Sequence, residues 1–152
     1  MNRDYRDLFA EFNARNVEFL IVGAFALAVH GHLRATKDLD VWVRPTPENA
    51  PRVLEAVRSF AGSIEGLSAI DFSVLGMIVQ LGVEPARIDL LTSIKGLEFE
   101  SAWRNRIEAS YGEQQVFVVS RADLITSKRA AGRPQDLADV AALDDADGNE
   151  EA

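Results

Sequence analysis

Three aspartates interrupt apolar stretches of the sequence in a pattern that suits a divalent metal ion. Asp38 and Asp40 are separated by a single leucine, and Asp89 has an apolar residue on each side. Side chains alternate between the two faces of a strand, so Asp38 and Asp40 should point the same way with Cβ atoms roughly 7 Å apart. Carboxylates this close repel one another unless a cation lies between them. The sequence therefore predicts a metal site.

The composition decides which metals suit this site. The chain has no cysteine and only two histidines, so carboxylate oxygens must supply the ligands. Oxygen ligands favour Mg²⁺, Mn²⁺ or Ca²⁺, and Mg²⁺ is usually held by a few carboxylates together with substrate phosphates. A lone Asp-x-Asp pair is more often a surface strand end without a function. The third aspartate in a second apolar strand favours Mg²⁺ binding here, because aspartate is depleted in strands.

A glycine turn precedes the aspartate pair and could bind a phosphate. Gly23 and Ala24 follow a continuous apolar run that is typical of a buried strand, and the next residues are alanine-rich and helical in pattern. Glycine permits a tight turn, and a helix N-terminus offers unpaired N–H donors and a positive dipole end. Many strand-to-helix turns contain a glycine for structural reasons alone. The aspartates downstream make the phosphate interpretation the more informative one.

Hydrophobic periodicity predicts the elements that position these residues. We expect helices near 3–15, 24–31, 47–60, 121–131 and 134–144, and strands near 19–22, 38–43, 77–81, 87–91, 107–111 and 115–119. Helices and strands are mixed, and only part of the chain alternates in the βα manner. The prediction is an α/β (α+β) fold with one mixed β-sheet flanked by helices and two C-terminal helices.

Composition and charge limit the class of protein. The 152 residues are 47% hydrophobic and 26% charged, which indicates a globular domain, here residues 1–143. The net charge is −8, and the last nine residues are acidic enough to predict a disordered tail over 144–152. The mildly acidic body argues against broad electrostatic binding of nucleic acid. No secretion signal or membrane span is visible, so we expect a cytoplasmic protein without membrane contact.

These features together resemble the polymerase-β-like nucleotidyltransferase superfamily, whose pattern is a glycine turn, an Asp-x-Asp strand and a third carboxylate on a further strand. The sequence is also similar to the minimal AbiEii-type group, which includes toxin components of phage-defence and toxin–antitoxin systems. The residues that carry this similarity are Gly23, Ala26, Leu27, Gly31, Arg34, Thr36, Asp38 and Asp40, then Leu124, Lys128, Ala131 to Pro134, Asp136, Leu137 and Asp139. Ala24 departs from the Gly or Ser usual after the first glycine, so that hydroxyl is absent while the backbone N–H remains.

The resemblance implies a reaction and a role for each residue. The protein would transfer an NMP from an NTP to a hydroxyl acceptor, with positioning and charge neutralisation carrying the catalysis. Asp38 and Asp40 would hold Mg²⁺ against the triphosphate, and Asp89 would complete a second metal site or act as the base. Nucleotide contacts are expected from Gly23, Ala24, Arg34, Thr36 and Lys128.

Purely structural roles remain alternatives to nucleotide binding for several of these residues. Lys128 could instead be a solvated helix residue, and Thr36 could only brace its loop. Arg133 is expected to pair with Asp136 at the start of the last helix. Trp42 shares the carboxylate face, where packing against the sheet is expected over stacking on a base.

The acceptor is left open by the sequence. Leading candidates are RNA, such as a tRNA 3′ end, and a protein hydroxyl, as in a toxin module with an antitoxin partner. A small-molecule acceptor, as in antibiotic nucleotidylation, fits the mildly acidic body at least as well. A non-catalytic module that binds a nucleotide or a partner is the third possibility, because Ala24 lacks the phosphate-binding hydroxyl.

Overall fold

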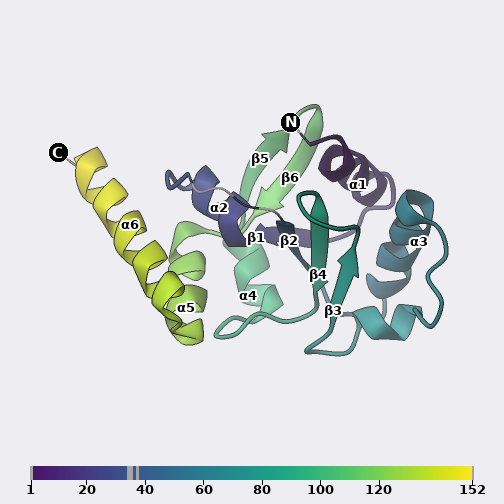
Figure 1. Ribbon diagram of the computed structural model, residues 1–152. Coiled ribbons are helices and arrows are strands. Elements are labelled where there is room, and N and C mark those ends of the chain that lie inside the picture. The colour runs from purple at the N-terminus through teal and green to yellow at the C-terminus, as the bar shows by residue number, and fades with distance from the viewer. Residues whose placement is uncertain (1, 34–35, 37, 152) are drawn as a thin grey trace.

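The computed structural model of the protein describes residues 2–33, 36 and 38–151, with side chains as far as residue 145. The described residues form a six-stranded sheet in the order β3-β4-β2-β1-β6-β5, flanked by helices (Figure 1). The strands are β1 (Phe19–Val22), β2 (Asp38–Val43), β3 (Ile78–Leu81), β4 (Arg87–Leu91), β5 (Ile107–Tyr111) and β6 (Gln114–Val118). The pairs β2–β4 and β1–β6 are parallel and the others antiparallel, so the predicted mixed sheet is confirmed.

Two helices, α1 (Arg3–Ala14) and α3 (Ala50–Ala61), pack together over one face of the sheet (Figure 1). The side chain of Asn2 caps α1 by accepting hydrogen bonds from the backbone N–H groups of Asp4 and Tyr5. The apolar positions of α1 recur at helical spacing and are buried. The ring of Phe9 stacks on that of Phe19 in β1, with 5.8 Å between centroids. The face that carries Phe19 is therefore packed against α1.

The opposite face of the sheet carries the predicted carboxylates and is partly covered by α4 (Phe99–Arg104). Trp42 follows Asp40 by one pleat repeat and is fully buried, with its ring 5.0 Å from that of Phe99. Trp42 therefore packs between sheet and helix, as expected. Neither α4 nor the short 3-10 helix η1 (Ala69–Phe72) was predicted, because each is too short to display a helical period.

The remaining helices are α2 (Gly23–Val29), α5 (Arg121–Ala131) and α6 (Pro134–Glu151). Gly132 adopts a left-handed conformation with φ 67° that ends α5, and Pro134 begins α6. We expected α6 to end near 144 and a disordered tail to follow. In the structure α6 runs to Glu151, in a stretch without a proline to stop it, and the disordered tail stays a prediction.

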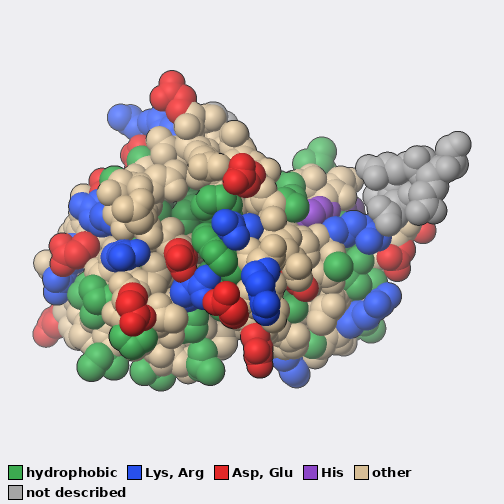
Figure 2. Space-filling model, turned by 180° about the vertical axis from the view of Figure 1, so that it is seen from behind, with side chains coloured by type: hydrophobic (Ala, Val, Ile, Leu, Met, Phe, Trp, Pro, Cys, Tyr) green, Lys and Arg blue, Asp and Glu red, His purple; other side chains and the backbone are tan. Residues whose placement is uncertain are grey.

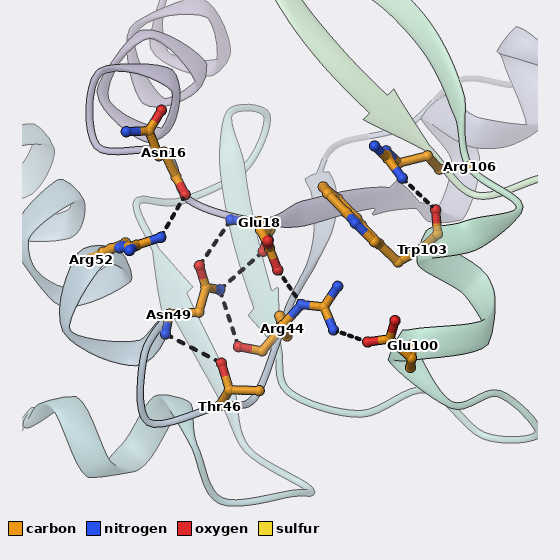
Figure 3. A network of polar contacts seen from close by, with 9 residues as sticks. All are labelled: Asn16, Glu18, Arg44, Thr46, Asn49, Arg52, Glu100, Trp103 and Arg106. Carbon is orange, nitrogen blue, oxygen red and sulfur yellow. Dashed lines mark hydrogen bonds and ion pairs between the residues drawn. The ribbon is translucent and has the colours of Figure 1, made fainter.

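A polar network fixes the end of β1–β2 that lies farthest from the carboxylates (Figure 3). Arg44 donates hydrogen bonds to the carboxylates of Glu18 and Glu100. Asn49 is buried; its side chain accepts from the N–H of Glu18 at 2.9 Å and donates to the carbonyls of Glu18 at 3.0 Å and Arg44 at 3.1 Å. These bonds hold the register in which Asp40 lies opposite Val22. In the part of the chain that the structure describes, no helix combines the length and apolar character needed to cross a membrane.

Candidate functional site

The three aspartates meet at neighbouring strands. Asp38 and Asp40 lie on β2, Asp89 lies on β4, and the parallel register places Asp40 directly beside Asp89. One carboxylate oxygen from each aspartate lies within 4.8 Å of the others. The convergence expected from strand alternation is therefore present. Three carboxylates around so small a volume match the oxygen donors that Mg²⁺ or Mn²⁺ takes in proteins, so these residues fit the predicted ion.

Asp40 has a raised pKa because of its position in this cluster. Burial, and after it the negative charges of Asp38 and Asp89, together raise the pKa of Asp40 from 3.8 to about 6. The positive charges of Lys128 and Arg87 act in the opposite direction without cancelling the rise. The part of this rise that comes from Asp38 and Asp89 reflects an excess of negative charge in the cluster. A divalent cation would relieve that excess.

Gly23 is required at the turn beside Asp40 for two independent reasons. Its φ of 71° lies in the left-handed region that residues with a side chain rarely adopt. A Cβ atom built at this position would lie 2.4 Å from Oδ2 of Asp40, far inside a van der Waals contact. Gly23 thus lets the backbone at the start of α2 approach the carboxylate, and no side chain caps that helix start.

A cavity of about 300 Å³ opens beside the carboxylates. Its lining includes Gly23, Ala24, Thr36, Asp38, Asp40, Lys128, Arg133, Gln135 and Asp136. A second cavity of about 240 Å³ is also lined by Gly23, Asp40 and Lys128. It runs beside α5 and is lined as well by Lys95, which precedes α4 in the chain. A larger groove of about 510 Å³ lies between α1, α3 and β4 and is lined instead by Asp4, Asp7 and Glu11. We place the site at the two smaller cavities, because Asp40 lines both of them and Asp38 lines the first, whereas Asp89 lies beside Asp40 on β4 and lines neither.

Lys128 extends from α5 into both cavities and is held by two buried carboxylates of α6. Its Nζ lies 3.0 Å from Oδ2 of Asp139 and 3.5 Å from Oδ1 of Asp136. Only 12% of the Lys128 side chain is exposed. The alternative of a solvated helix lysine is therefore wrong. Its predicted contact with a nucleotide stays a prediction, although a fixed cation at the cavity wall is suited to one.

Asp136 and Asp139, two buried aspartates of α6, support the site structurally. Asp136 accepts hydrogen bonds from the backbone N–H of Arg133 at 3.2 Å and from its Nε at 2.7 Å, which confirms the expected pair. The bond from Arg133 holds the pKa of Asp136 below its usual range. Asp139 is fully buried and accepts from Nε2 of Gln135 at 2.9 Å. Sequence reasoning gave Asp139 no role, although its spacing three residues after Asp136 placed both on one helix face.

Thr36 lies two residues before β2 and beside Asp38. The hydroxyl of Thr36 donates to the backbone carbonyl of Asp38 at 2.8 Å and lies 3.1 Å from its carboxylate. Thr36 therefore braces Asp38, and its contact with a nucleotide stays a prediction. Arg34, another predicted nucleotide contact, lies outside the described residues.

Arg87 belongs to the site and was missed from the sequence. Its Nη2 lies 2.7 Å from Oδ2 of Asp38, and its Nε lies 3.1 Å from Oδ1 of Asp89. Strand alternation could have found it, because Arg87 stands two residues before Asp89 on the predicted strand and so shares its face.

Comparison with known proteins identifies the fold. The family model described as nucleotidyltransferase of unknown function (DUF6036) matches residues 4–144. One solved structure of similar fold is an antigenic nucleotidyltransferase-like protein from Paracoccidioides brasiliensis, with a TM-score of 0.51 and 18% sequence identity. The similarity covers 90% of this chain and 71% of that one. No curated protein matches the sequence.

Proposed function

The chain belongs to this family of nucleotidyltransferases, and on that premise we propose that it is a Mg²⁺-dependent enzyme that transfers an NMP from an NTP to a hydroxyl acceptor. The observation that carries the proposal is the convergence of Asp38, Asp40 and Asp89, of which Asp38 and Asp40 line a cavity together with Lys128. Mg²⁺, when bound, would neutralise charge on the triphosphate and polarise the reacting phosphate. Mn²⁺ suits the same oxygen ligands, and two ions are expected, as in other two-metal phosphoryl transfer sites.

The proposed reaction is a displacement at the α-phosphate. The oxygen of the acceptor hydroxyl forms a bond to the α-phosphorus, and the bond from that phosphorus to the α–β bridging oxygen breaks. Pyrophosphate leaves with the electron pair of that bond. Asp89 would accept the proton of the hydroxyl, because it is a carboxylate at the cluster with only 8% of its surface exposed.

The triphosphate would lie along the cavity walls that supply positive charge and backbone donors. Lys128 offers a cation that two buried aspartates already orient, so little side-chain entropy is lost when it binds a phosphate. Gly23 and Ala24 offer the start of α2, where backbone N–H groups lack intrahelical partners. Arg34 and Thr36 would add contacts from the preceding loop.

For the acceptor we propose RNA, such as a tRNA 3′ end, or a protein hydroxyl, with the chain acting as a toxin of the AbiEii type beside an antitoxin partner. Acidic and basic side chains are interspersed on the face seen in Figure 2, which is not a continuous basic surface. An RNA acceptor would therefore be recognised locally at the site rather than through a broad electrostatic field. We place this activity in the cytoplasm.

A labelling experiment tests the proposal. Each labelled NTP is incubated with Mg²⁺ and the protein in three separate reactions. One contains total RNA as the acceptor, one contains a hydroxylated cationic antibiotic, and one contains no added acceptor, so that only the protein itself can be labelled. We expect incorporation into one acceptor, and loss of it in the double variant Asp38→Asn with Asp40→Asn. Asp145→Asn, an exposed carboxylate of α6, is the matched control and should retain activity. NTP binding without incorporation into any acceptor would contradict the enzyme and favour a non-catalytic binding module.

A further inference from the structure

The guanidinium of Arg87 lies among the carboxylates that are proposed to hold the metal ion. Besides its bonds to Asp38 and to Oδ1 of Asp89, its Nη2 lies 3.3 Å from Oδ2 of Asp89. Arg87 therefore contacts both oxygens of Asp89 and one of Asp38. Its side chain is 27% exposed, compared with 12% for that of Asp89, so the contact is partly shielded from water.

The sheet itself places Arg87 there. In the parallel pair β2–β4, Arg87 lies opposite Asp38, and Asp89 lies opposite Asp40. The four side chains share one face of the sheet, because residues two apart on a strand point the same way. An arginine at this register position therefore faces the cluster whenever the sheet is formed, and its charge is permanent because a guanidinium is not deprotonated in proteins.

Arg87 and a divalent cation would compete for the same oxygens. A guanidinium donates hydrogen bonds to the carboxylate lone pairs that a metal ion uses for coordination. Arg87 contacts Oδ2 of Asp38 and both carboxylate oxygens of Asp89, so a metal ion cannot take these oxygens fully while the guanidinium holds them. Binding of one therefore opposes binding of the other.

We propose that Arg87 is an internal counter-ion that holds Asp38 and Asp89 together in the metal-free protein and leaves them when a divalent cation binds. This inference rests on the proposed metal site. The structure offers a position for the displaced guanidinium, since Nη1 already lies 3.8 Å from Oε1 of Glu84 in the β3–β4 turn. Glu84 is 53% exposed, so a rotation toward it carries the charge outward from the cluster. Arg87 is thus a positioning residue that sets the metal affinity.

Mn²⁺ binding measured by electron paramagnetic resonance tests the competition without reference to catalysis. We expect Arg87→Gln to bind Mn²⁺ at least about tenfold more tightly than wild type, because the competing charge is gone. Arg87→Lys keeps the charge but loses the planar fork that contacts two carboxylates, and its affinity should lie between the two. Arg58→Gln makes the same charge change at an exposed ion pair of α3 and should leave the affinity within about twofold.

The melting temperature in chelator is the second measurement, and it shows whether the variants fold. Arg87→Gln should melt below wild type without metal, since its carboxylates lose their counter-ion, and should regain most of that loss when Mn²⁺ is added. Equal or weaker Mn²⁺ binding by Arg87→Gln, with wild type binding normally, would overturn the competition and leave the metal site standing. Mn²⁺ binding by none of the proteins would overturn the metal site as well, and with it the proposed function.

Discussion

At the scale of single residues, the site depends on the protonation of Asp40, which its burial and the neighbouring charges control. Asp40 is covered by neighbouring elements, lies beside two other carboxylates, and receives only partial compensation from Lys128 and Arg87. Its pKa of about 6 expresses the resulting preference for the neutral form. Such a group costs the folded protein stability whenever it is ionised, unless a cation is present.

The pH dependence of stability follows from this preference. The folded-state pKa of Asp40 lies above its ordinary value of 3.8, so the folded protein binds the proton more tightly than the unfolded chain. In chelator, the destabilisation should be absent near pH 4, develop as pH rises toward 6, and be complete at pH 7.5. It amounts to roughly 3 kcal/mol at most.

The variant Asp40→Asn isolates this contribution. Denaturant unfolding in chelator should show it more stable than wild type at pH 7.5 and of similar stability near pH 4. Asp7→Asn, which alters an exposed carboxylate of α1, should show no such pH-dependent difference. Equal stability of wild type and Asp40→Asn at pH 7.5 would mean that the charges around Asp40 are already balanced.

Gly23 gives a second prediction at the same scale. Gly23→Ala requires a left-handed alanine and also drives its Cβ against Asp40, whereas Gly76→Ala meets the same backbone cost with nothing within 4 Å. The first cost is about 1–2 kcal/mol. Gly23→Ala should therefore lose more stability than Gly76→Ala in denaturant unfolding, and it should also lose nucleotide binding. Equal losses would show that Asp40 moves aside without cost.

At the scale of elements, buried ion pairs join the helices α5 and α6. The Lys128 cation of α5 is matched by Asp136 and Asp139 of α6, and both aspartates are buried. Breaking a buried pair by removing one partner is costly, since the remaining charge stays buried without compensation.

Lys128→Met should therefore destabilise the protein by about 3–5 kcal/mol in denaturant unfolding. Adding Asp139→Leu to Lys128→Met should restore part of that loss, because a buried carboxylate that has lost the Lys128 cation is then removed. Arg129→Met, one residue along α5 at a side chain that is 63% exposed, is the control and should change stability by less than about 1 kcal/mol. A loss no larger than that of the control would mean that water reaches Asp139 in solution.

The same scale separates what the sequence could predict from what it could not. Strands β1 and β2 were predicted with their observed bounds, because apolar runs and clean alternation identify them. The helix α4 was missed because its six residues show no period, yet it buries Trp42 on the carboxylate face. Arg87 was within reach of strand alternation. The buried ion pairs of Lys128 were not, because they depend on how α6 packs against α5.

At the scale of the whole molecule, ligand binding should be visible as stability. A ligand that binds only the folded state raises the melting temperature by mass action, by an amount that grows with its concentration over its Kd. NTP with Mg²⁺ should therefore raise the melting temperature of wild type, and the shift should disappear in Asp38→Asn with Asp40→Asn. Scanning calorimetry with and without each NTP measures this. An equal shift in the double variant would place the nucleotide away from the three aspartates.

The positions of Asp38, Asp89 and Lys128 along the chain also determine the order in which the parts of the site form during synthesis. A ribosome makes the chain from its N-terminus, and β2 and β4 can pair before α5 and α6 exist. Until α6 has been made, Lys128 has neither Asp136 nor Asp139 to hold it beside the cavity. A nucleotide site that needs this lysine is therefore completed only after α6 has been made. For a proposed toxin, this would protect the ribosome and the tRNAs that are making it from an active unfinished chain.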